Sequence, residues 1–362
     1  MSAYRSFETI KNIGVIGTGT IGASWATYFL SRGFKVKAWD PGDEWKDRIL
    51  DFINNAWPQM NALGAKKEFQ ETNIELCSSL EDALSEVEFV QESAPEQLEI
   101  KRSLFKKIDK YADNSSIISS STSGLIMSEM QDGLECASRF VVGHPFNPPH
   151  LIPLVEVVGG EKTDPSAVDW AINFYNKIGK HAIKINKEVP GHLANRLQAA
   201  LWREAVLAVQ NDLASVEDIN AAVAMGPGLR WALMGPHMIM NLTGGSGGFR
   251  KMLDHFGPGI AEWWETMNQN PELDEALKQQ LINGIKVEAK GRSIAQLEEE
   301  RDALKKEKKE LEKVLNSKAR LKTFIKNELK EIKENFGDDR NSPIIESSTA
   351  KMFSEEDTIT SD

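Results

Sequence analysis

The sequence predicts an α/β fold: an N-terminal Rossmann-type, doubly wound sheet, followed by an all-α second domain and a charged helical C-terminal extension. Two observations predict the sheet. Short apolar runs alternate with helical stretches over the first half of the chain, which favours parallel strands covered by helices. The stretch GVIGTGTIG, residues 14–22, places a glycine turn between the first apolar run and a helix. The loss of strand-like runs after residue 188 predicts the helical domain.

The elements follow from short quoted stretches. Helical spacing is clearest in IGASWATYFLSRG, residues 21–33, and in QLEIKRSLFKKIDKYA, residues 97–112. Each is bounded by apolar runs of strand length. The predicted strands are NIGVIG (12–17), KVKAWD (35–40), VEFVQESA (87–94), SSIISSSTS (115–123), RFVVGHPF (139–146) and KHAIKI (180–185).

The glycine turn is the first sign of function. Gly17, Gly19 and Gly22 have G-x-G-x-x-G spacing between a predicted strand and a predicted helix. In that setting the glycines permit a tight turn, close approach of a pyrophosphate and close helix–strand packing, while the helix N-terminus attracts the phosphates. We therefore expect the whole turn to bind a dinucleotide: Gly17, Thr18, Gly19, Thr20, Ile21 and Gly22.

The acid that ends the second predicted strand indicates which dinucleotide binds. Asp40 lies eighteen residues after Gly22, where a carboxylate binds the ribose 2′-hydroxyl. The same carboxylate would repel a 2′-phosphate, and no arginine follows it directly. The sequence therefore favours NAD over NADP.

Four segments are predicted from these patterns. Residues 1–188 are expected to form the NAD-binding Rossmann domain. Residues 189–291 are Ala- and Leu-rich at helical spacing, and we expect an all-α domain that binds substrate and forms a homodimer. Residues 292–340 are predicted to be a charged helical extension, and residues 341–362 a disordered tail.

Charge sets the C-terminal extension apart. Residues 292–362 contain 32 charged side chains among 71 residues, against 65 in the preceding 291. Leucines recur every seven residues from Leu297, but Arg301 and Lys308 occupy the alternate seam positions and weaken a coiled coil. Residues 317–344 resemble the end of the coiled-coil region of DNA gyrase and topoisomerase IV A subunits. The strand-cleaving domain is missing, so that resemblance implies no topoisomerase activity.

Composition argues against several classes of protein. A net charge of −11 argues against a nucleic-acid surface on residues 1–291. Cys77 and Cys136 are the only cysteines and form no CxxC pair, so we expect no disulfide scaffold, no metal site and a reducing, cytoplasmic location. The N-terminus lacks the pattern of a signal peptide, and no run approaches 18 apolar residues, so we expect no membrane segment.

A histidine and a buried acid are the candidates for chemistry. A dehydrogenase that oxidises an alcohol needs a base near pH 7, and histidine serves best when a carboxylate holds its second ring nitrogen. His144 ends a predicted strand at the sheet edge where ligands bind, and His150 lies in the proline-rich loop after it. Glu156 lies in an apolar run, where an unpaired charge would be costly. These patterns favour His144 over His150 but leave a structural role open for either.

Several motifs in order carry a family resemblance. They are IGVIGTGTIG, QESAPEQLEIK, SSSTSG, GHPFNPP with LVEVV, and VPGHLANRL. From about residue 10 to 290 the chain resembles the L-3-hydroxyacyl-CoA dehydrogenase superfamily. The resemblance implies that His144 is the base, that Glu156 orients it and that His150 is incidental. It also implies that Ser120 hydrogen-bonds the substrate oxygen and that Asn195 belongs to the active site.

The same resemblance assigns two cofactor residues and contains one departure. Glu96 and Lys101 match positions that contact the nicotinamide-side ribose and phosphates. For Lys101 the alternative is an ordinary lysine on a helix surface, and for Asn195 it is a helix cap. Ser121 departs from the pattern, because the acyl-CoA enzymes usually carry Asn there.

The expected substrate is a small L-3-hydroxy acid. Acyl-CoA enzymes carry lysines for the CoA phosphates in a helix after the second strand, and residues 40–64 lack such a cluster. Residues 225–236, MGPGLRWALMGP, resemble the branch of the superfamily that oxidises L-carnitine to 3-dehydrocarnitine. The alternatives are L-gulonate or an L-3-hydroxyacyl-CoA ester. A structural relative without turnover is an alternative of another class.

The second domain contains candidates for binding such a substrate. Aromatic faces bind quaternary ammonium groups through cation–π contacts, which makes Trp231, Trp263 and Trp264 candidates. Tryptophan at helical spacing is more often part of a core, which is the competing reading. Arg230 is a candidate for pairing the substrate carboxylate, with a structural ion pair as the alternative.

Overall fold

The computed structural model describes residues 4–65, 68–267, 269–298 and 300. The described residues up to 298 belong to one compact unit. The extension predicted at 292–340 is described only at its start. The tail predicted at 341–362 and the segment that resembles gyrase lie outside the described residues.

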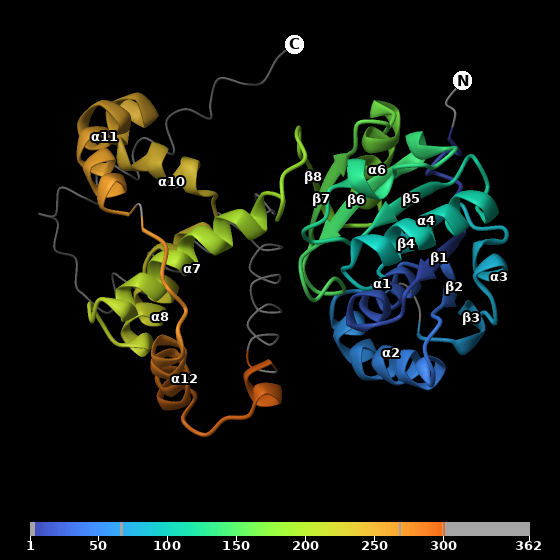
Figure 1. Cartoon of the computed structure of the whole chain (residues 1–362), viewed down its shortest axis with the longest axis horizontal. Helices are drawn as coiled ribbons and strands as arrows, with labels where there is room; N and C mark the ends of the chain where they lie inside the picture. Colours follow the sequence, from blue (N-terminus) through green and yellow to red (C-terminus); the bar gives the residue numbers. More distant parts are fainter. Residues whose placement is uncertain (1–3, 66–67, 268, 299, 301–362) are drawn as a thin grey trace, which may run out of the picture. The chain divides into compact units, whose positions relative to one another are not determined.

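Strands and helices alternate through the first part of the chain (Figure 1). The strands are β1 (Asn12–Ile16), β2 (Lys35–Trp39), β3 (Ile74–Leu76), β4 (Phe89–Glu92), β5 (Ile117–Ser120), β6 (Phe140–Pro145), β7 (Leu154–Gly159) and β8 (His181–Lys184). The α-helices between them are α1 (Thr20–Ser31), α2 (Trp45–Ala62), α3 (Leu80–Leu84), α4 (Leu98–Tyr111), α5 (Met127–Met130) and α6 (Pro165–Lys177).

The eight strands form one sheet in the order β3-β2-β1-β4-β5-β6-β7-β8. Neighbouring strands are parallel except β6 and β7. The strand order reverses between β1 and β4, which creates the crevice where ligands of such folds bind. The predicted doubly wound sheet is confirmed. The sequence did not predict β3, which has three residues, or the antiparallel β7, which follows β6 after a connection too short for a helical crossover.

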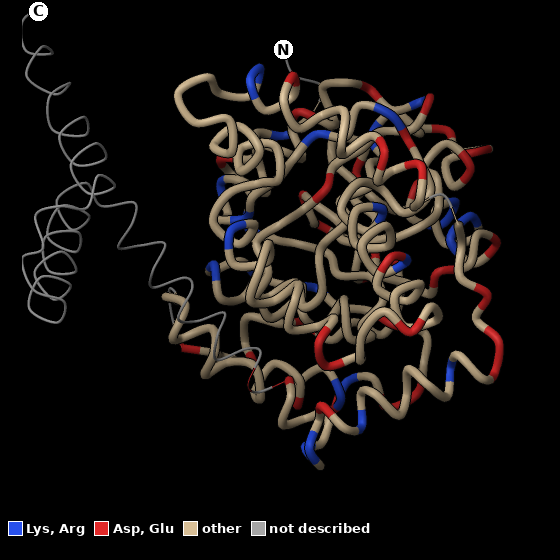
Figure 2. The backbone as a smooth tube through the Cα atoms, turned by 90° about the vertical axis from the view of Figure 1, so that its left-hand side faces the viewer, with Lys and Arg blue, Asp and Glu red and all other residues tan. Residues whose placement is uncertain are grey.

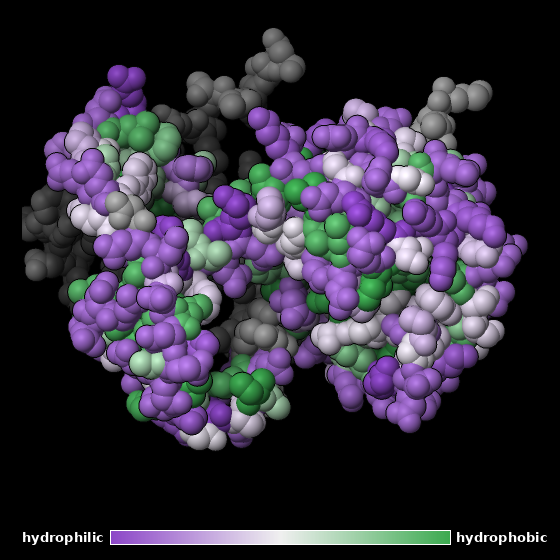
Figure 3. All heavy atoms as spheres, viewed as in Figure 1, coloured by the Kyte–Doolittle hydropathy of each residue, from purple (hydrophilic) through white to green (hydrophobic). Residues whose placement is uncertain are grey.

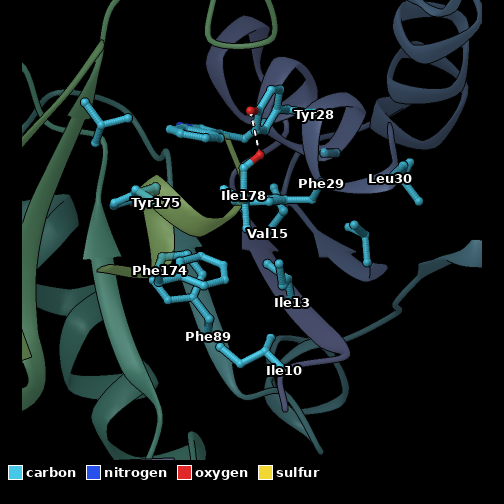
Figure 4. Packing of buried hydrophobic residues seen from close by; sticks show 14 of the residues in the cluster. Ile10, Ile13, Val15, Tyr28, Phe29, Leu30, Phe89, Phe174, Tyr175 and Ile178 are labelled. Carbon is cyan, nitrogen blue, oxygen red and sulfur yellow. Dashed lines mark hydrogen bonds between the residues drawn. The ribbon is translucent and has the colours of Figure 1, made fainter. Parts of the chain in front are cut away.

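Two cores cover the two faces of the sheet, because successive side chains of a strand point in opposite directions. On one face the sheet packs against α1, α2 and α6, with Phe174 of α6 4.5 Å from Phe89 between ring centroids (Figure 4). The Tyr28 hydroxyl donates to the Ile178 carbonyl at 2.9 Å beside this core. The other face is covered by α3, α4 and α5. Paired neighbours divide between the two cores: Val15 and Ile16, Phe89 and Val90, Ile117 and Ile118, Val141 and Val142.

The chain is helical after β8, as the sequence predicted. Two of the helices begin at side-chain caps: Ser215 accepts from the Asp218 amide, and Asp274 from the Leu277 amide. The helices are α7 (Ala194–Gln210), α8 (Val216–Met225), α9 (Pro227–Trp231), α10 (Pro236–Thr243), α11 (Gly248–Thr266) and α12 (Glu275–Ala289).

The surface carries both signs of charge. Figure 2 shows acidic and basic residues interspersed along the described backbone. Among the described residues, no helix is both long enough and apolar enough to cross a membrane.

Candidate active site

The turn between β1 and α1 is built for close approach. Gly17 has φ +88°, and an added Cβ would lie 2.7 Å from the Ser93 backbone. A Cβ on Gly22 would lie 1.8 Å from the Gly17 carbonyl oxygen, so the helix can start here only with glycine at both positions. A Cβ on Gly19 would meet nothing within 4 Å, which leaves open space over the turn.

At the start of α1 the turn leaves donors without partners in the described protein. Gly19 caps α1 without a side-chain hydrogen bond, and no acid lies in the first helical turn. The Thr18 hydroxyl is buried and makes no hydrogen bond with the described protein. Asp40 follows β2 and accepts from the Thr18 amide at 2.8 Å through one oxygen and from the Gly42 amide through the other. Free amides at a helix N-terminus beside an acid suit a dinucleotide with an unmodified ribose.

His144 and Glu156 meet because β6 and β7 are antiparallel. The two residues lie opposite each other in the strand register. His144 Nδ1 donates to Glu156 Oε2 at 2.8 Å. The carboxylate can only accept, so Nδ1 carries a proton, and in the neutral form of the ring Nε2 has the lone pair.

The backbone at the start of α7 holds Glu156 in place. Its Oε1 accepts from the Leu193 amide at 2.9 Å and from the Ala194 amide at 2.8 Å. Burial would raise the pKa of this fully buried carboxyl, but the hydrogen bonds from His144 and the two amides hold it below the usual 4.5. The carboxylate therefore stays ionised and fixes the orientation of the imidazole.

A cavity of about 410 Å³ opens beside this pair. Asn195 and Gln198 reach it from one turn of α7, and Phe146 from the loop after β6. None of the described lining residues is a lysine or an arginine. The lining consists of Ile21, Ser121, Ser123, His144, Pro145, Phe146, Asn147, Asn195 and Gln198.

A buried ion pair, which the sequence did not predict, lies under the loop after β4. Lys101 on α4 donates to Glu92 Oε1 at 2.7 Å, and neither side chain is exposed. Ser120 donates to the other Glu92 oxygen at 2.5 Å. This corrects the expectation for Ser120, because its buried hydroxyl serves Glu92 and does not line the cavity. Ser121 and Ser123, beyond the end of β5, line it instead.

Glu96 is half exposed and organises the loop after β5. It accepts from the Thr122 hydroxyl at 2.6 Å and the Gly124 amide at 2.7 Å. Partial burial would raise its pKa, but these hydrogen bonds and nearby Lys101 hold it below 4.5. Lys101 itself is only 1% exposed, which corrects the expected direct contact with cofactor phosphates. It neutralises buried Glu92.

His150 is structural rather than incidental. Its amide donates to the Ser24 hydroxyl on α1 at 2.9 Å, and its Nδ1 lies 2.7 Å from the same oxygen. Nε2 lies 3.1 Å from Gln59 Oε1 on α2. The Gln59 side-chain carbonyl oxygen can only accept, so Nε2 carries the ring proton and Nδ1 accepts from the Ser24 hydroxyl. His150 therefore ties the cavity loop to α1 and α2.

A third histidine, His192, lies in the stretch VPGHLANRL, and the sequence did not predict it as a site residue. It is buried, its Nε2 lies 3.1 Å from the Thr122 carbonyl oxygen, and its ring centroid lies 5.1 Å from that of His144. Nothing in its local sequence distinguishes it from a helix-start residue, so only the structure identifies it.

The residues proposed for cation and carboxylate recognition do not reach the cavity in the described chain. Arg230 and Trp231 lie on α9, and Trp263 and Trp264 on α11. The three indoles are 40%, 66% and 67% exposed, and none of the four residues is in the cavity lining. Phe146 is the aromatic side chain that lines it.

Sheet, glycine turn and acid after β2 together define a class of protein, the NAD-dependent dehydrogenases with a Rossmann fold. The family models agree. Residues 12–189 match the NAD-binding domain of 3-hydroxyacyl-CoA dehydrogenase, and residues 191–283 match its C-terminal domain. The chain belongs to the 3-hydroxyacyl-CoA dehydrogenase family.

Curated relatives are similar over most of the chain. An L-carnitine dehydrogenase of Streptomyces griseus is 49% identical over 295 residues, which cover 82% of this chain and 88% of the relative. An L-carnitine dehydrogenase of Pseudomonas putida is 39% identical, covering 81% and 91%.

Solved structures share the fold. An NAD⁺-dependent 5-formyl-3-hydroxy-2-methylpyridine 4-carboxylic acid 5-dehydrogenase has a TM-score of 0.71 at 27% identity, covering 84% of this chain and 98% of that one. The 3-hydroxybutyryl-CoA dehydrogenase of Escherichia coli has a TM-score of 0.58 at 25% identity, covering 76% of this chain and 57% of that one.

Proposed function

We propose that this protein oxidises L-carnitine to 3-dehydrocarnitine with NAD, using His144 as the general base. The observation that carries the proposal is the His144–Glu156 pair beside a cavity that contains hydroxyl and amide groups. The identity to several L-carnitine dehydrogenases supports the choice of substrate.

The geometry of the pair determines the chemistry. His144 Nε2 accepts the proton of the substrate hydroxyl as its O–H bond breaks, and the C3–O bond becomes a carbonyl. Ionised Glu156 stabilises the imidazolium that results and keeps the proton on Nδ1 throughout. NAD, when bound, supplies the acceptor for the hydride that leaves C3. Ser123 and Asn195 are proposed to bind the reacting oxygen, in the place first expected for Ser120.

We propose that the cofactor binds to the glycine turn, Asp40 and Glu96. The amides at residues 19–22 would face the pyrophosphate, and Asp40 the ribose diol. Glu96 would approach the nicotinamide-side ribose, because its second oxygen accepts no hydrogen bond in the described protein. Lys101 supports this loop from beneath.

The cavity lining favours a small zwitterion over a CoA ester. No lysine or arginine of the described lining could meet CoA phosphates. Neutral donors on Asn195 and Gln198 can bind a carboxylate, and the Phe146 ring offers a face for the trimethylammonium group. The uncharged tert-butyl analogue of carnitine should therefore bind about 1–2 kcal/mol more weakly, the scale of a desolvated cation–π contact. Phe146→Leu should remove most of that difference.

NADH formation with a substrate panel tests the proposal. L-carnitine should be turned over, whereas L-gulonate and 3-hydroxybutyryl-CoA should react poorly. His144→Ala should lower kcat roughly 100-fold or more, the scale of general-base losses. His181→Ala, at an exposed histidine of β8, is the matched control and should have no effect. Turnover of the CoA ester without carnitine oxidation would contradict the substrate assignment. A folded, NAD-binding protein inactive on all three would favour a structural relative.

We also propose a homodimer formed through the helical domain, residues 189–291, with residues 1–188 as the NAD-binding domain. Apart from Ile100, every large hydrophobic side chain exposed in the described chain lies between Leu193 and Ile294. Figure 3 shows patches of apolar residues on the helical part of the described chain. Among the described residues of these helices, three buried side chains form one cluster, Val206, Val209 and Leu277, and the other buried hydrophobic side chains are Leu207, Ile239 and Met252. Exposed apolar surface of this kind needs a partner. Sedimentation equilibrium should give twice the chain mass, and a monomer would contradict the proposal.

A cytoplasmic location completes the proposal. The described structure leaves Cys77 and Cys136 as free thiols, which suits a reducing compartment. Fractionation of the source cells with an antibody to the chain would test it, and recovery of the protein outside the cytoplasm would contradict it.

A further inference from the structure

His192 lies at the junction between the two parts of the active site. It lies two residues before the start of α7, with a left-handed backbone at φ +49° and 2% exposure. Its ring lies beside that of His144, with centroids 5.1 Å apart and planes at 41°. Its Nε2 lies 3.1 Å from the Thr122 carbonyl oxygen.

The contact with Thr122 fixes the tautomer. A carbonyl oxygen can only accept, so Nε2–H of His192 donates to it. Nδ1 is buried and has no hydrogen-bond partner in the described protein. The charged or titratable groups that face the ring are His144 on β6, Glu156 on β7 and Glu96 after β4. Burial, together with His144, lowers the pKa of His192, so the neutral ring, which donates through Nε2–H alone, is the form that fits this environment.

Both ends of His192 are tied to site residues. On its backbone side, the next two amides, Leu193 and Ala194, bind Glu156. On its ring side, Thr122 is followed by Ser123, which lines the cavity. One residue thus connects the start of α7, which holds the carboxylate, to the loop after β5.

We infer that His192 is a positioning residue whose Nε2–H bond to Thr122 fixes the loop of Ser123 against the His144–Glu156 pair. The inference rests on the proposed function, in which that pair removes the substrate proton. His192 touches neither of the reacting atoms in this account. It acts by keeping the base and the cavity loop in one arrangement, and small errors in such placement cost large factors in rate.

Three substitutions separate the hydrogen bond from packing. Gln places an amide N–H close to the position of Nε2, Asn places its amide nearer to Nδ1, and Phe keeps ring volume without a donor. His192→Gln should keep kcat within about threefold of the parent protein. His192→Asn and His192→Phe should lower kcat by roughly tenfold or more, with a smaller change in KM, as expected when placement is lost.

The full chain with NAD and L-carnitine is the assay, and thermal unfolding confirms that each variant is folded. A His192→Phe protein as active as the parent would overturn the inference, because packing alone would then suffice. Equal losses in all three variants would also overturn it, since the donor would bring no rescue. If the Phe variant does not fold, the comparison of kcat between His192→Gln and His192→Asn tests the inference, because both side chains are neutral amides that differ by one methylene.

His144→Ala, measured beside these variants, separates the two claims. If His144→Ala is inactive and His192→Gln is as impaired as the other variants at residue 192, only the positioning role of His192 is contradicted. If His144→Ala is active, the proposed function itself is contradicted, whatever activity the variants at residue 192 have.

Discussion

Glu156→Gln is the substitution that tests the site most directly, because it changes one oxygen to nitrogen at full burial. The carboxylate accepts three hydrogen bonds, from His144 Nδ1 and from the Leu193 and Ala194 amides, all between 2.8 and 2.9 Å. The single carbonyl oxygen of Gln can still accept from the two amides. Its NH₂ group then faces His144 Nδ1, which must accept instead of donate. The ring proton moves to Nε2, and the base loses its lone pair.

The size of the effect follows from those contacts. Loss of general-base function should lower kcat by about 10²–10⁴-fold, with little change in KM. One charge-assisted hydrogen bond is lost, which should reduce the free energy of unfolding by about 2 kcal/mol. For a unit of about 300 residues that corresponds to a fall in thermal midpoint of roughly 3 °C.

The stability difference should depend on pH. The pKa of Glu156 is held below 4.5 in the folded protein, so its ionised form stabilises the fold above that pH. This contribution is lost as pH falls through the lowered pKa. The gap between parent and variant should therefore be widest above pH 4.5 and should close below it.

Steady-state NADH formation and calorimetry across pH provide the measurements, with Glu161→Gln at an exposed position as the control. A Glu156→Gln protein that kept a third or more of the parent kcat would refute the reasoning, as would an unchanged thermal midpoint at pH 7.

Three further outcomes are expected. Gly22→Ala should destabilise the protein by about 1–3 kcal/mol or more, because its Cβ would lie 1.8 Å from the Gly17 carbonyl oxygen. Gly19→Ala should fold normally and bind NAD more weakly. Thermal unfolding and NAD titration distinguish the two variants. Asp40→Ala should weaken NAD binding and reduce the preference for NAD over NADP, expected to be at least about tenfold in kcat/KM. Equal use of both cofactors by the parent protein would contradict that assignment. Lys101→Met should lower the free energy of unfolding by about 3 kcal/mol, since it leaves Glu92 buried without its cation, and an unchanged denaturation midpoint would count against the buried pair.

The cofactor end of the site could be predicted because its geometry is local. Three glycines within six residues and an acid at the end of the next strand specify the turn and the ribose contact. The structure adds only what they pack against. Ser93, for example, has no signature in the sequence, yet its backbone is what excludes a side chain at Gly17.

The substrate end was predicted less well, because residue spacing does not show which side of a strand end faces a ligand. Ser120 and Ser123 lie in one serine-rich stretch, but β5 ends at Ser120 with its hydroxyl turned to Glu92. In the sequence, Glu92 is only a single acid after an apolar run. The tryptophans on α9 and α11 had suitable chemistry, but the described chain does not bring them to the cavity.

The sequence by itself determined the sheet apart from β3 and β7, the dinucleotide turn and the helical second part, since periodicity and glycine spacing act over a few neighbouring residues. The family resemblance placed His144 and Glu156 in one site, and the antiparallel register of β6 and β7 shows how they meet. Only the tertiary structure decided that Lys101 is buried, that Ser123 lines the cavity and that His192 joins its two sides. These are contacts between residues distant in the chain, and no local pattern specifies which polar groups will share one buried space.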